Sequence, residues 1–117
     1  MRHKALKYFY DIRQACDLIE QFTRGKSFEE YLGDALLRSA VERQFMIVGE
    51  ALFQALNVDP SRKKAITDAR RIINFRHVMV HGYAAITPAT VWGVVQEDLA
   101  TLRREVETLL VEAAPKQ

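Results

Sequence analysis

The segment ALKYFYDIRQACDLI, residues 5–19, decides the fold class. Its apolar residues recur at spacings of four and three, which places them on one side of a helix. They are Ala5, Phe9, Ile12, Cys16 and Ile19. The segment therefore predicts a long amphipathic helix, which Gly25 is placed to end.

Two further helices are predicted from their caps. Ser27 and Glu30 match a capping box, in which a hydroxyl and a carboxylate bind free amides at a helix start, so SFEEYL is expected to form a short helix that ends near Gly33. Asp34 is the expected N-cap of a longer helix that runs to about Leu56. Its core-facing residues are predicted to be Leu37, Val41, Val48, Ala51, Leu52 and Ala55.

Proline marks the start of the last two helices. After Asp59-Pro60, the pattern of Ile66, Ala69, Ile73 and Val80 predicts a helix that continues until Gly82 breaks it. After Thr87-Pro88, a last helix is expected with Val91, Val95, Leu99, Leu102, Val106 and Leu109 toward the core. No stretch alternates long enough to suggest a strand, so residues 1–117 are predicted to be one domain, an up-and-down bundle of four main helices plus one short helix.

Composition limits the class of protein. Of 117 residues, 49% are hydrophobic and only eight are glycine or proline, as in a packed globular domain. Cys16 is the single cysteine, which excludes an internal disulfide and a cysteine-cluster metal site. No leader is visible and no apolar run approaches the roughly 20 residues that span a bilayer. A soluble cytoplasmic protein without membrane attachment is expected.

Charge is unevenly distributed along the chain. Residues 61–77 hold Arg62, Lys63, Lys64, Arg70, Arg71 and Arg76 against Asp68 alone, which gives +5, so the total of +2 leaves −3 for the remainder. This segment could be an ordinary solvated helix face. It could also attract phosphate groups.

The stretch RHVMVHGY, residues 76–83, gathers two of the three histidines beside an arginine and a tyrosine. Arg76 lies three residues after Ile73 and four before Val80, within the apolar stripe, so its guanidinium needs an acceptor there. That acceptor could be a carboxylate such as Glu50 or a phosphate that binds later. Tyr83 could simply cover the apolar layer with its hydroxyl in water.

His77 and His81 share a helix face with Arg70 and Asn74. Two histidines at this spacing could bind zinc, but neither an HExxH pattern nor a cysteine pair supplies the remaining ligands, so no metal site is predicted. His81 is expected at the carboxyl end of the helix, where the dipole favours its protonated form, which suits proton transfer.

Arg76 and His81 are five residues apart, about 500° of rotation on an ideal helix, so their side chains diverge by about 140°. Either the helix ends between them or a second copy of the chain completes the site. A homodimer with a two-fold axis is the usual geometry for the second case.

The chain resembles the HepT-like toxins, helical ribonucleases of the HEPN superfamily. The resemblance covers YDIRQACDLIEQFTRGKSFEEYL at residues 10–32, AVERQFMIVGEAL at 40–52, FRHVMVHGY at 75–83 and VWGVVQEDLATL at 91–102, and it includes the family's Arg-x4-His-x-Tyr signature. Many relatives have Asn or Asp directly after the arginine, where this chain has His77.

The resemblance implies a ribonuclease toxin of a prokaryotic toxin–antitoxin pair. A homodimer would place Arg76 and His81 of both copies in one cleft, and Asn74, Arg70, Arg71 and His77 would support catalysis or bind RNA. The implied antitoxin is a minimal nucleotidyltransferase, which inhibits by binding or by transferring AMP to Tyr83; that AMP could pair with Arg76.

Arginine and histidine suffice for metal-independent RNA cleavage, because the 2′-OH is an internal nucleophile. We therefore expect a ribonuclease that uses no cofactor or metal and prefers single-stranded RNA. Two alternatives remain open: a non-catalytic module that docks a nucleotidyltransferase or RNA, and a purely structural bundle.

Overall fold

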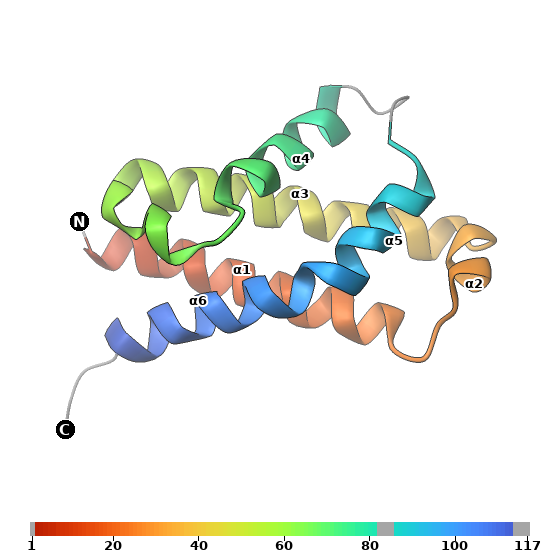
Figure 1. Cartoon of the computed structure of the whole chain (residues 1–117), viewed down its shortest axis with the longest axis horizontal. Coiled ribbons are helices and arrows are strands. Elements are labelled where there is room, and N and C mark those ends of the chain that lie inside the picture. Colours follow the sequence, from red (N-terminus) through yellow and green to blue (C-terminus); the bar gives the residue numbers. More distant parts are fainter. Residues whose placement is uncertain (1, 82–85, 114–117) are drawn as a thin grey trace.

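The computed structural model describes residues 2–81 and 86–113, which form six α-helices and one 3₁₀ helix, with no strand in these two ranges. The elements are α1 (Arg2–Thr23), α2 (Phe28–Leu32), α3 (Ala35–Val58), η1 (Pro60–Ala65), α4 (Ala69–His81), α5 (Pro88–Glu97) and α6 (Leu99–Ala113). They make an elongated bundle of 47 × 30 × 20 Å (Figure 1). The predicted all-α bundle is confirmed.

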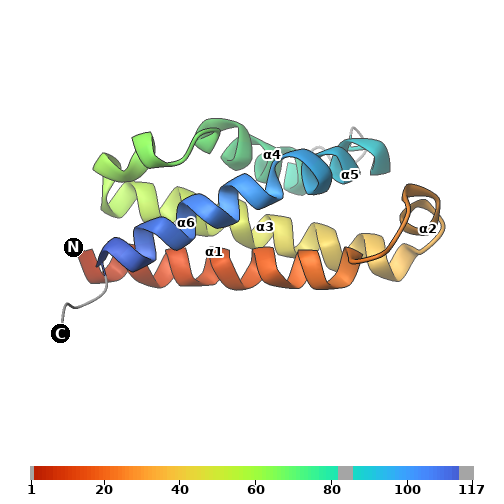
Figure 2. The same ribbon diagram turned by 60° about the horizontal axis from the view of Figure 1, so that its bottom comes forward.

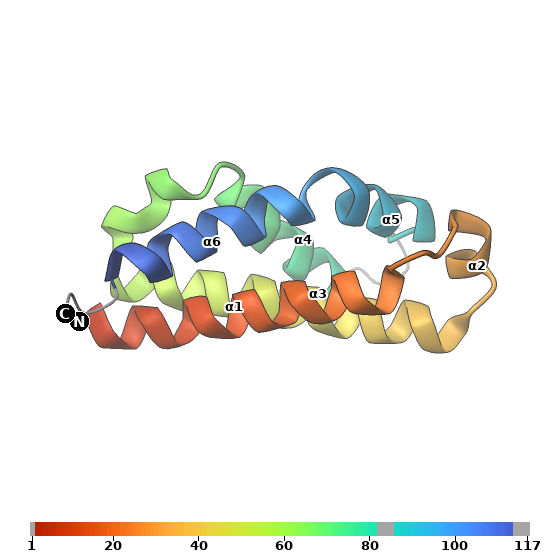
Figure 3. The ribbon, with the colours of Figure 1, turned by 90° about the horizontal axis from the view of Figure 1, so that it is seen from below.

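The two longest helices, α1 and α3, form the body of the bundle. Helix α6 packs along α1, as Figures 2 and 3 both show, and α4 packs chiefly on α3. All the core positions predicted in α1, α3, α5 and α6 are buried. The apolar spacing of these four helices therefore identified their inner faces correctly.

Three predicted helix starts, at Ser27, Asp34 and Thr87, are also confirmed. The hydroxyl of Ser27 accepts a hydrogen bond from the Glu30 amide at 3.1 Å, and the Glu30 carboxylate accepts one from the Ser27 amide at 2.9 Å. Asp34 and Thr87 cap α3 and α5 through their side chains. Gly25 has a φ of 72°, the left-handed conformation that favours glycine after a helix.

The single helix predicted from Pro60 to Gly82 is wrong at its start. Residues Pro60–Ala65 form the 3₁₀ helix η1, and Ile66 has extended backbone angles before α4 begins at Ala69. Ile66 and Ala69 are nonetheless both in the core as predicted, with 3% and 4% of their surface exposed. Further along α4, Val80 is 41% exposed and not in the core as predicted, because no other helix of the described chain covers it.

The last helix is likewise two helices. Its regular run ends at Glu97, and the backbone of Asp98 forms a turn before α6 begins at Leu99. The Asp98 amide still donates to the carbonyl of Val94, and the Asp98 carbonyl accepts from the Leu102 amide. The turn therefore bends the helix without leaving these backbone groups unpaired, and α5 turns toward α2, as Figure 2 shows.

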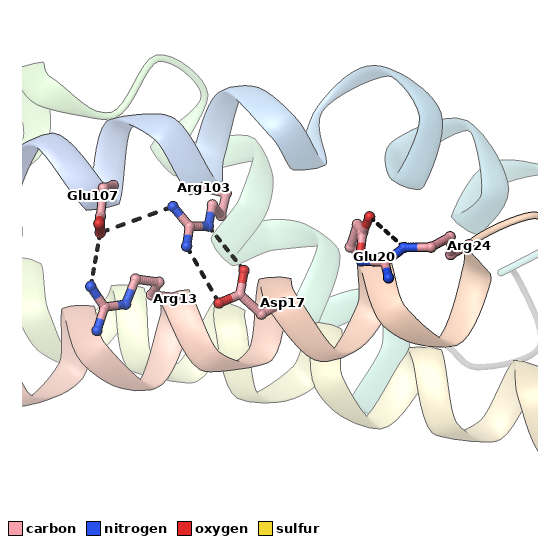
Figure 4. Close-up of polar contacts among 6 residues, drawn as sticks. All are labelled: Arg13, Asp17, Glu20, Arg24, Arg103 and Glu107. Carbon is pink, nitrogen blue, oxygen red and sulfur yellow. Dashed lines mark hydrogen bonds and ion pairs between the residues drawn. The ribbon is translucent and has the colours of Figure 1, made fainter.

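A chain of ion pairs links α1 to α6 across the surface of the bundle (Figure 4). Arg103 donates to Asp17 at 2.9 Å, and Arg13 donates to Glu107 at 2.8 Å. Arg103 also lies 4.0 Å from Glu107, which joins the two pairs into one network. We call these four residues the α1–α6 seam.

None of the described helices is both long enough and apolar enough to cross a membrane.

Candidate functional site

Helix α4 carries the residues predicted to act on RNA, and it presents them on different faces. Arg70, Asn74, His77 and His81 recur at spacings of four, three and four, and all four are exposed. The rings of His77 and His81 lie 4.7 Å apart between centroids. The predicted polar row is therefore present on the solvent side of α4.

Arg76 lies on another face of α4, toward α3. Its side chain is 30% exposed, and its guanidinium lies 3.0 Å from the carboxylate of Glu50. Glu50 also accepts a hydrogen bond from Gln54 at 2.9 Å. The carboxylate acceptor suggested by the sequence is thus the one the structure provides, and it remains accessible because Glu50 is 45% exposed.

Gly49 sets the distance between α3 and α4 at this point. A Cβ atom added to Gly49 would lie 2.1 Å from the Cβ of Arg76 and 2.8 Å from its Cγ. Any larger residue would therefore push α4 outward and move Arg76. The sequence held a signal for this contact, since glycine inside a helix costs about 1 kcal/mol relative to alanine and needs a reason to be there.

A pocket of about 310 Å³ surrounds the Arg76 side chain. It is bounded by α1, α3 and α4, and its lining includes Tyr8, Asp11, Arg43, Met46, Glu50 and Val80. Arg43 is a second cation here that sequence reasoning did not identify. Among the described side chains, no carboxylate forms an ion pair with Arg43.

Arg76 and His81 do not converge in one copy of the chain. Helix α4 is continuous through both residues, so the five-residue spacing keeps their side chains about 140° apart. Ile73 and Val80 lie between the two faces on the helix surface, and Val80 is exposed. Of the two possibilities raised by the sequence, an end of the helix between Arg76 and His81 is therefore excluded.

Arg71 projects away from the polar row and forms an ion pair with Asp98 at the turn between α5 and α6. Tyr83, like Gly82, lies outside the described residues. In the part of the chain that is described, no three His, Cys, Asp or Glu side chains cluster closely enough to hold a metal ion.

Comparison with known proteins identifies the family. A family model described as Ribonuclease HepT-like matches residues 12–109, which contain all of α3, α4 and α5. The chain belongs to this family. The HepT-like assignment agrees with the resemblance carried by the motif and by the three blocks around it.

Two curated relatives match over most of their length. "Probable ribonuclease HepT" of Thermococcus cleftensis is 33% identical over 109 residues, which is 93% of this chain and 98% of that protein. "Putative RNase MJ1380" of Methanocaldococcus jannaschii is 28% identical over 100 residues, which is 86% of this chain and 91% of that protein. No solved structure matches the chain.

Proposed function

We propose that this protein is the endoribonuclease toxin of a prokaryotic toxin–antitoxin pair, and that it cleaves RNA without a metal ion. The observation that carries the proposal is the HepT-like ribonuclease match across residues 12–109. Within that range, helix α4 carries both groups that the proposed chemistry uses: the cation of Arg76 and the imidazole of His81. Both relatives named above carry ribonuclease names, which supports RNA as substrate. The cytoplasm is the expected location.

The two side chains supply what phosphodiester transfer requires. A histidine takes the proton of the 2′-OH, the 2′ oxygen forms a bond to phosphorus, and the bond from phosphorus to the 5′ oxygen breaks. A protonated histidine donates a proton to that leaving oxygen, and Arg76 stabilises the extra negative charge on the phosphorane. The products are a 2′,3′-cyclic phosphate and a free 5′-OH.

A homodimer would bring the separated groups together. The divergence of Arg76 and His81 within one copy requires the histidine of one chain to meet the arginine of the other. Exposed apolar side chains flank the Arg76–Glu50 pair: Val80 on α4 and Phe53 on α3, which are 41% and 45% exposed. Such a patch suits a contact between two copies about a two-fold axis.

The polar row extends this site. His77, beside His81, would take the supporting role that its position has in the family motif, and Asn74 and Arg70 continue toward the start of α4. They would contact sugar and phosphate groups of the strand. Arg71, which is paired with Asp98, would contribute to RNA binding only through its positive charge near the row.

The antitoxin partner would be a minimal nucleotidyltransferase that inhibits the toxin by binding or by AMP transfer. In the transfer, the hydroxyl oxygen of Tyr83 bonds to the α-phosphorus of ATP and pyrophosphate leaves. Tyr83 follows His81 by two residues in the sequence. The added AMP group would carry a negative charge toward Arg76 and compete with RNA phosphate.

Cleavage of a labelled single-stranded RNA in EDTA tests the activity. We expect wild type to produce cyclic-phosphate ends, and Arg76→Ala or His81→Ala each to slow cleavage by about 10² or more. Arg104→Ala, which removes an exposed cation from α6, is the matched control and should cleave at the wild-type rate.

Two results would contradict the proposal. One is a near-normal rate in both Arg76→Ala and His81→Ala. The other is cleavage that disappears in EDTA and returns with Mg²⁺. An RNA with a 2′-deoxy sugar at the cleaved position should resist, because it lacks the nucleophile.

AMP transfer is tested by mass spectrometry. Incubation with the nucleotidyltransferase encoded beside the toxin and ATP should add the mass of AMP to wild type and not to Tyr83→Phe. Equal labelling of both proteins would assign the modification to another residue. Inhibition without any added mass would leave inhibition by binding as the mechanism.

A non-catalytic docking module is the second candidate, and one observation favours it. In the single chain, Arg76 already has a carboxylate partner in Glu50, as a structural arginine would. Such a module would bind RNA or a nucleotidyltransferase and leave RNA intact even when protein is in excess. The EDTA assay separates the two candidates directly.

A further inference from the structure

An open hollow of about 880 Å³ lies between η1 and the first turns of α4. Its volume is within the range of about 300–1,000 Å³ that small-ligand sites occupy. Lys63 and Lys64 line it from η1, and Arg70, Arg71 and Asn74 line it from α4. The break that separates η1 from α4 creates this hollow, so the sequence pattern, which predicted one helix, did not reveal it.

The hollow holds cations that form no ion pair with the described carboxylates. Lys63, Lys64 and Arg70 are exposed, and none of them forms an ion pair with a described carboxylate. Asp68 is the single acidic residue among those that line the hollow. Three unpaired positive charges against one negative charge around one concave surface favour an anionic ligand.

The walls of the hollow are fixed to the rest of the bundle. The backbone amide of Thr67, in the turn between η1 and α4, donates to the carboxylate of Glu105 on α6 at 3.1 Å, and the Thr67 hydroxyl donates to the same carboxylate. At the other end, Asp59 accepts hydrogen bonds from Ser61 and Arg62. The lysines are therefore held on an anchored turn and do not need to be ordered by the ligand.

We propose that this hollow binds the sugar-phosphate backbone of the RNA several nucleotides away from the cleaved bond. The inference rests on the proposed ribonuclease function. Arg70 and Asn74 belong both to the hollow and to the row that ends at His81. The row thus connects the hollow to the proposed catalytic histidine along one exposed face of α4.

The distance along α4 sets the length of RNA required. Arg70 and His81 are eleven residues apart, about 16 Å along the axis at about 1.5 Å per residue. A stacked strand advances about 3.4 Å per nucleotide, so roughly five nucleotides bridge the two points. Substrates of three nucleotides would reach the histidine but not the hollow, whereas longer strands would bind both.

The test compares two double variants that remove the same charge. Lys63→Gln with Lys64→Gln neutralises the hollow, and Lys26→Gln with Arg104→Gln neutralises two exposed cations outside it. Cleavage is measured on a twelve-nucleotide and a three-nucleotide single-stranded RNA. We expect the hollow variant to raise KM about tenfold on the longer RNA, with kcat and the short substrate unaffected, and the control to match wild type.

Salt dependence gives a second readout. Binding of a twelve-nucleotide RNA with 2′-O-methyl sugars, which cannot be cleaved, is followed by fluorescence anisotropy at several salt concentrations. Losing two phosphate contacts should reduce the slope of log Kd against log salt by about 1.4, since each contact to a single strand contributes about 0.7.

The outcomes separate this inference from the proposed function. If wild type cleaves RNA and the hollow variant equals its control on both substrates, the inference is overturned and the function stands. An equal loss on the long and short RNA would also overturn it. If wild type does not cleave RNA but the hollow variant weakens binding of the methylated strand, the proposed function fails and the hollow remains an RNA site.

Discussion

The α1–α6 seam and helix α4 use their side chains in opposite ways. Along the seam, apolar residues of α1 are buried, and the charges above them are paired with one another (Figure 4). In α4, only Ala69 and Met79 of 13 residues are buried, and the two histidines, Val80 and Arg70, which pairs with no described carboxylate, face outward. The charged groups of the seam are paired within the chain. Many side chains of α4 are instead exposed, where they can contact a second molecule.

This difference separates stability from function. Removing a buried side chain or a contact inside the bundle lowers the free energy of unfolding, whereas removing an exposed side chain changes it little. Helix α4 is attached chiefly through α3, with Gly49 against Arg76 as its closest contact. Changes on the outer face of α4 should therefore affect assembly and cleavage, and changes along the seam should affect stability alone.

The largest expected effect comes from a charge on the exposed apolar patch of α4. Val80→Glu should convert a dimer to a monomer and lower cleavage by about 10² or more, because a site shared between copies is lost. Light scattering coupled to size exclusion measures the mass. Val111→Glu, at a 65% exposed position on α6, is the control and should retain both properties. A monomeric wild type that cleaves RNA would contradict the shared site.

Gly49→Ala should have the next largest effect. The added Cβ would overlap the Cβ of Arg76, so α4 has to move, which should lower the free energy of unfolding by about 1–3 kcal/mol and also reduce cleavage. Gly93→Ala in α5 is the matched control: nothing lies within 4 Å of its added Cβ. It should stabilise the protein by about 0.5–1 kcal/mol. Urea unfolding measures the free energy of unfolding of both variants. Equal stability of Gly49→Ala and Gly93→Ala would contradict the prediction.

Breaking the seam should cost less. Arg103→Gln removes the group that contacts both Asp17 and Glu107, and surface ion pairs contribute about 0–1 kcal/mol each. The loss of unfolding free energy should shrink in high salt, where such pairs are screened. Arg104→Gln, the exposed neighbour, should change nothing. Cleavage by folded Arg103→Gln should equal wild type; a large loss of activity would show that the seam also serves function.

The smallest effect is expected at Cys16, below the seam. Burial, aided by the charge of Asp17, raises the pKa of its thiol to about 12. At pH 8 about one thiol in 10⁴ is then ionised, so iodoacetamide should not label the folded protein but should label it in urea. The pKa of the Cys16 thiol is higher in the folded protein than in the unfolded one, so the stability that comes from burying the neutral thiol is complete below about pH 8.5. The free energy of unfolding should decline as the pH rises above that value. Rapid labelling of folded protein at pH 8 would contradict the buried position.

Much of the candidate site could be predicted from sequence because it depends on spacing within one helix. The row of Arg70, Asn74, His77 and His81 follows directly from helical periodicity, and so does the divergence of Arg76 from it. The sequence also showed that residues 61–77 are basic, but the place of Arg43 beside Arg76 and the concave shape of the basic hollow could not be predicted. They depend on which helices meet and on the break in the helix near Ile66, which the apolar spacing does not show.

The sequence by itself determined the all-α class, the caps at Ser27, Asp34 and Thr87, and the inner faces of α1, α3, α5 and α6. These features are local, since a cap or a stripe depends on residues three or four positions apart. Tertiary structure alone decided that Arg76 meets Glu50 beside Gly49 and that Val80 stays exposed. The first outcome depends on how closely α4 packs against α3, and the second on the absence of another described helix over Val80. The spacing of residues within one segment encodes neither.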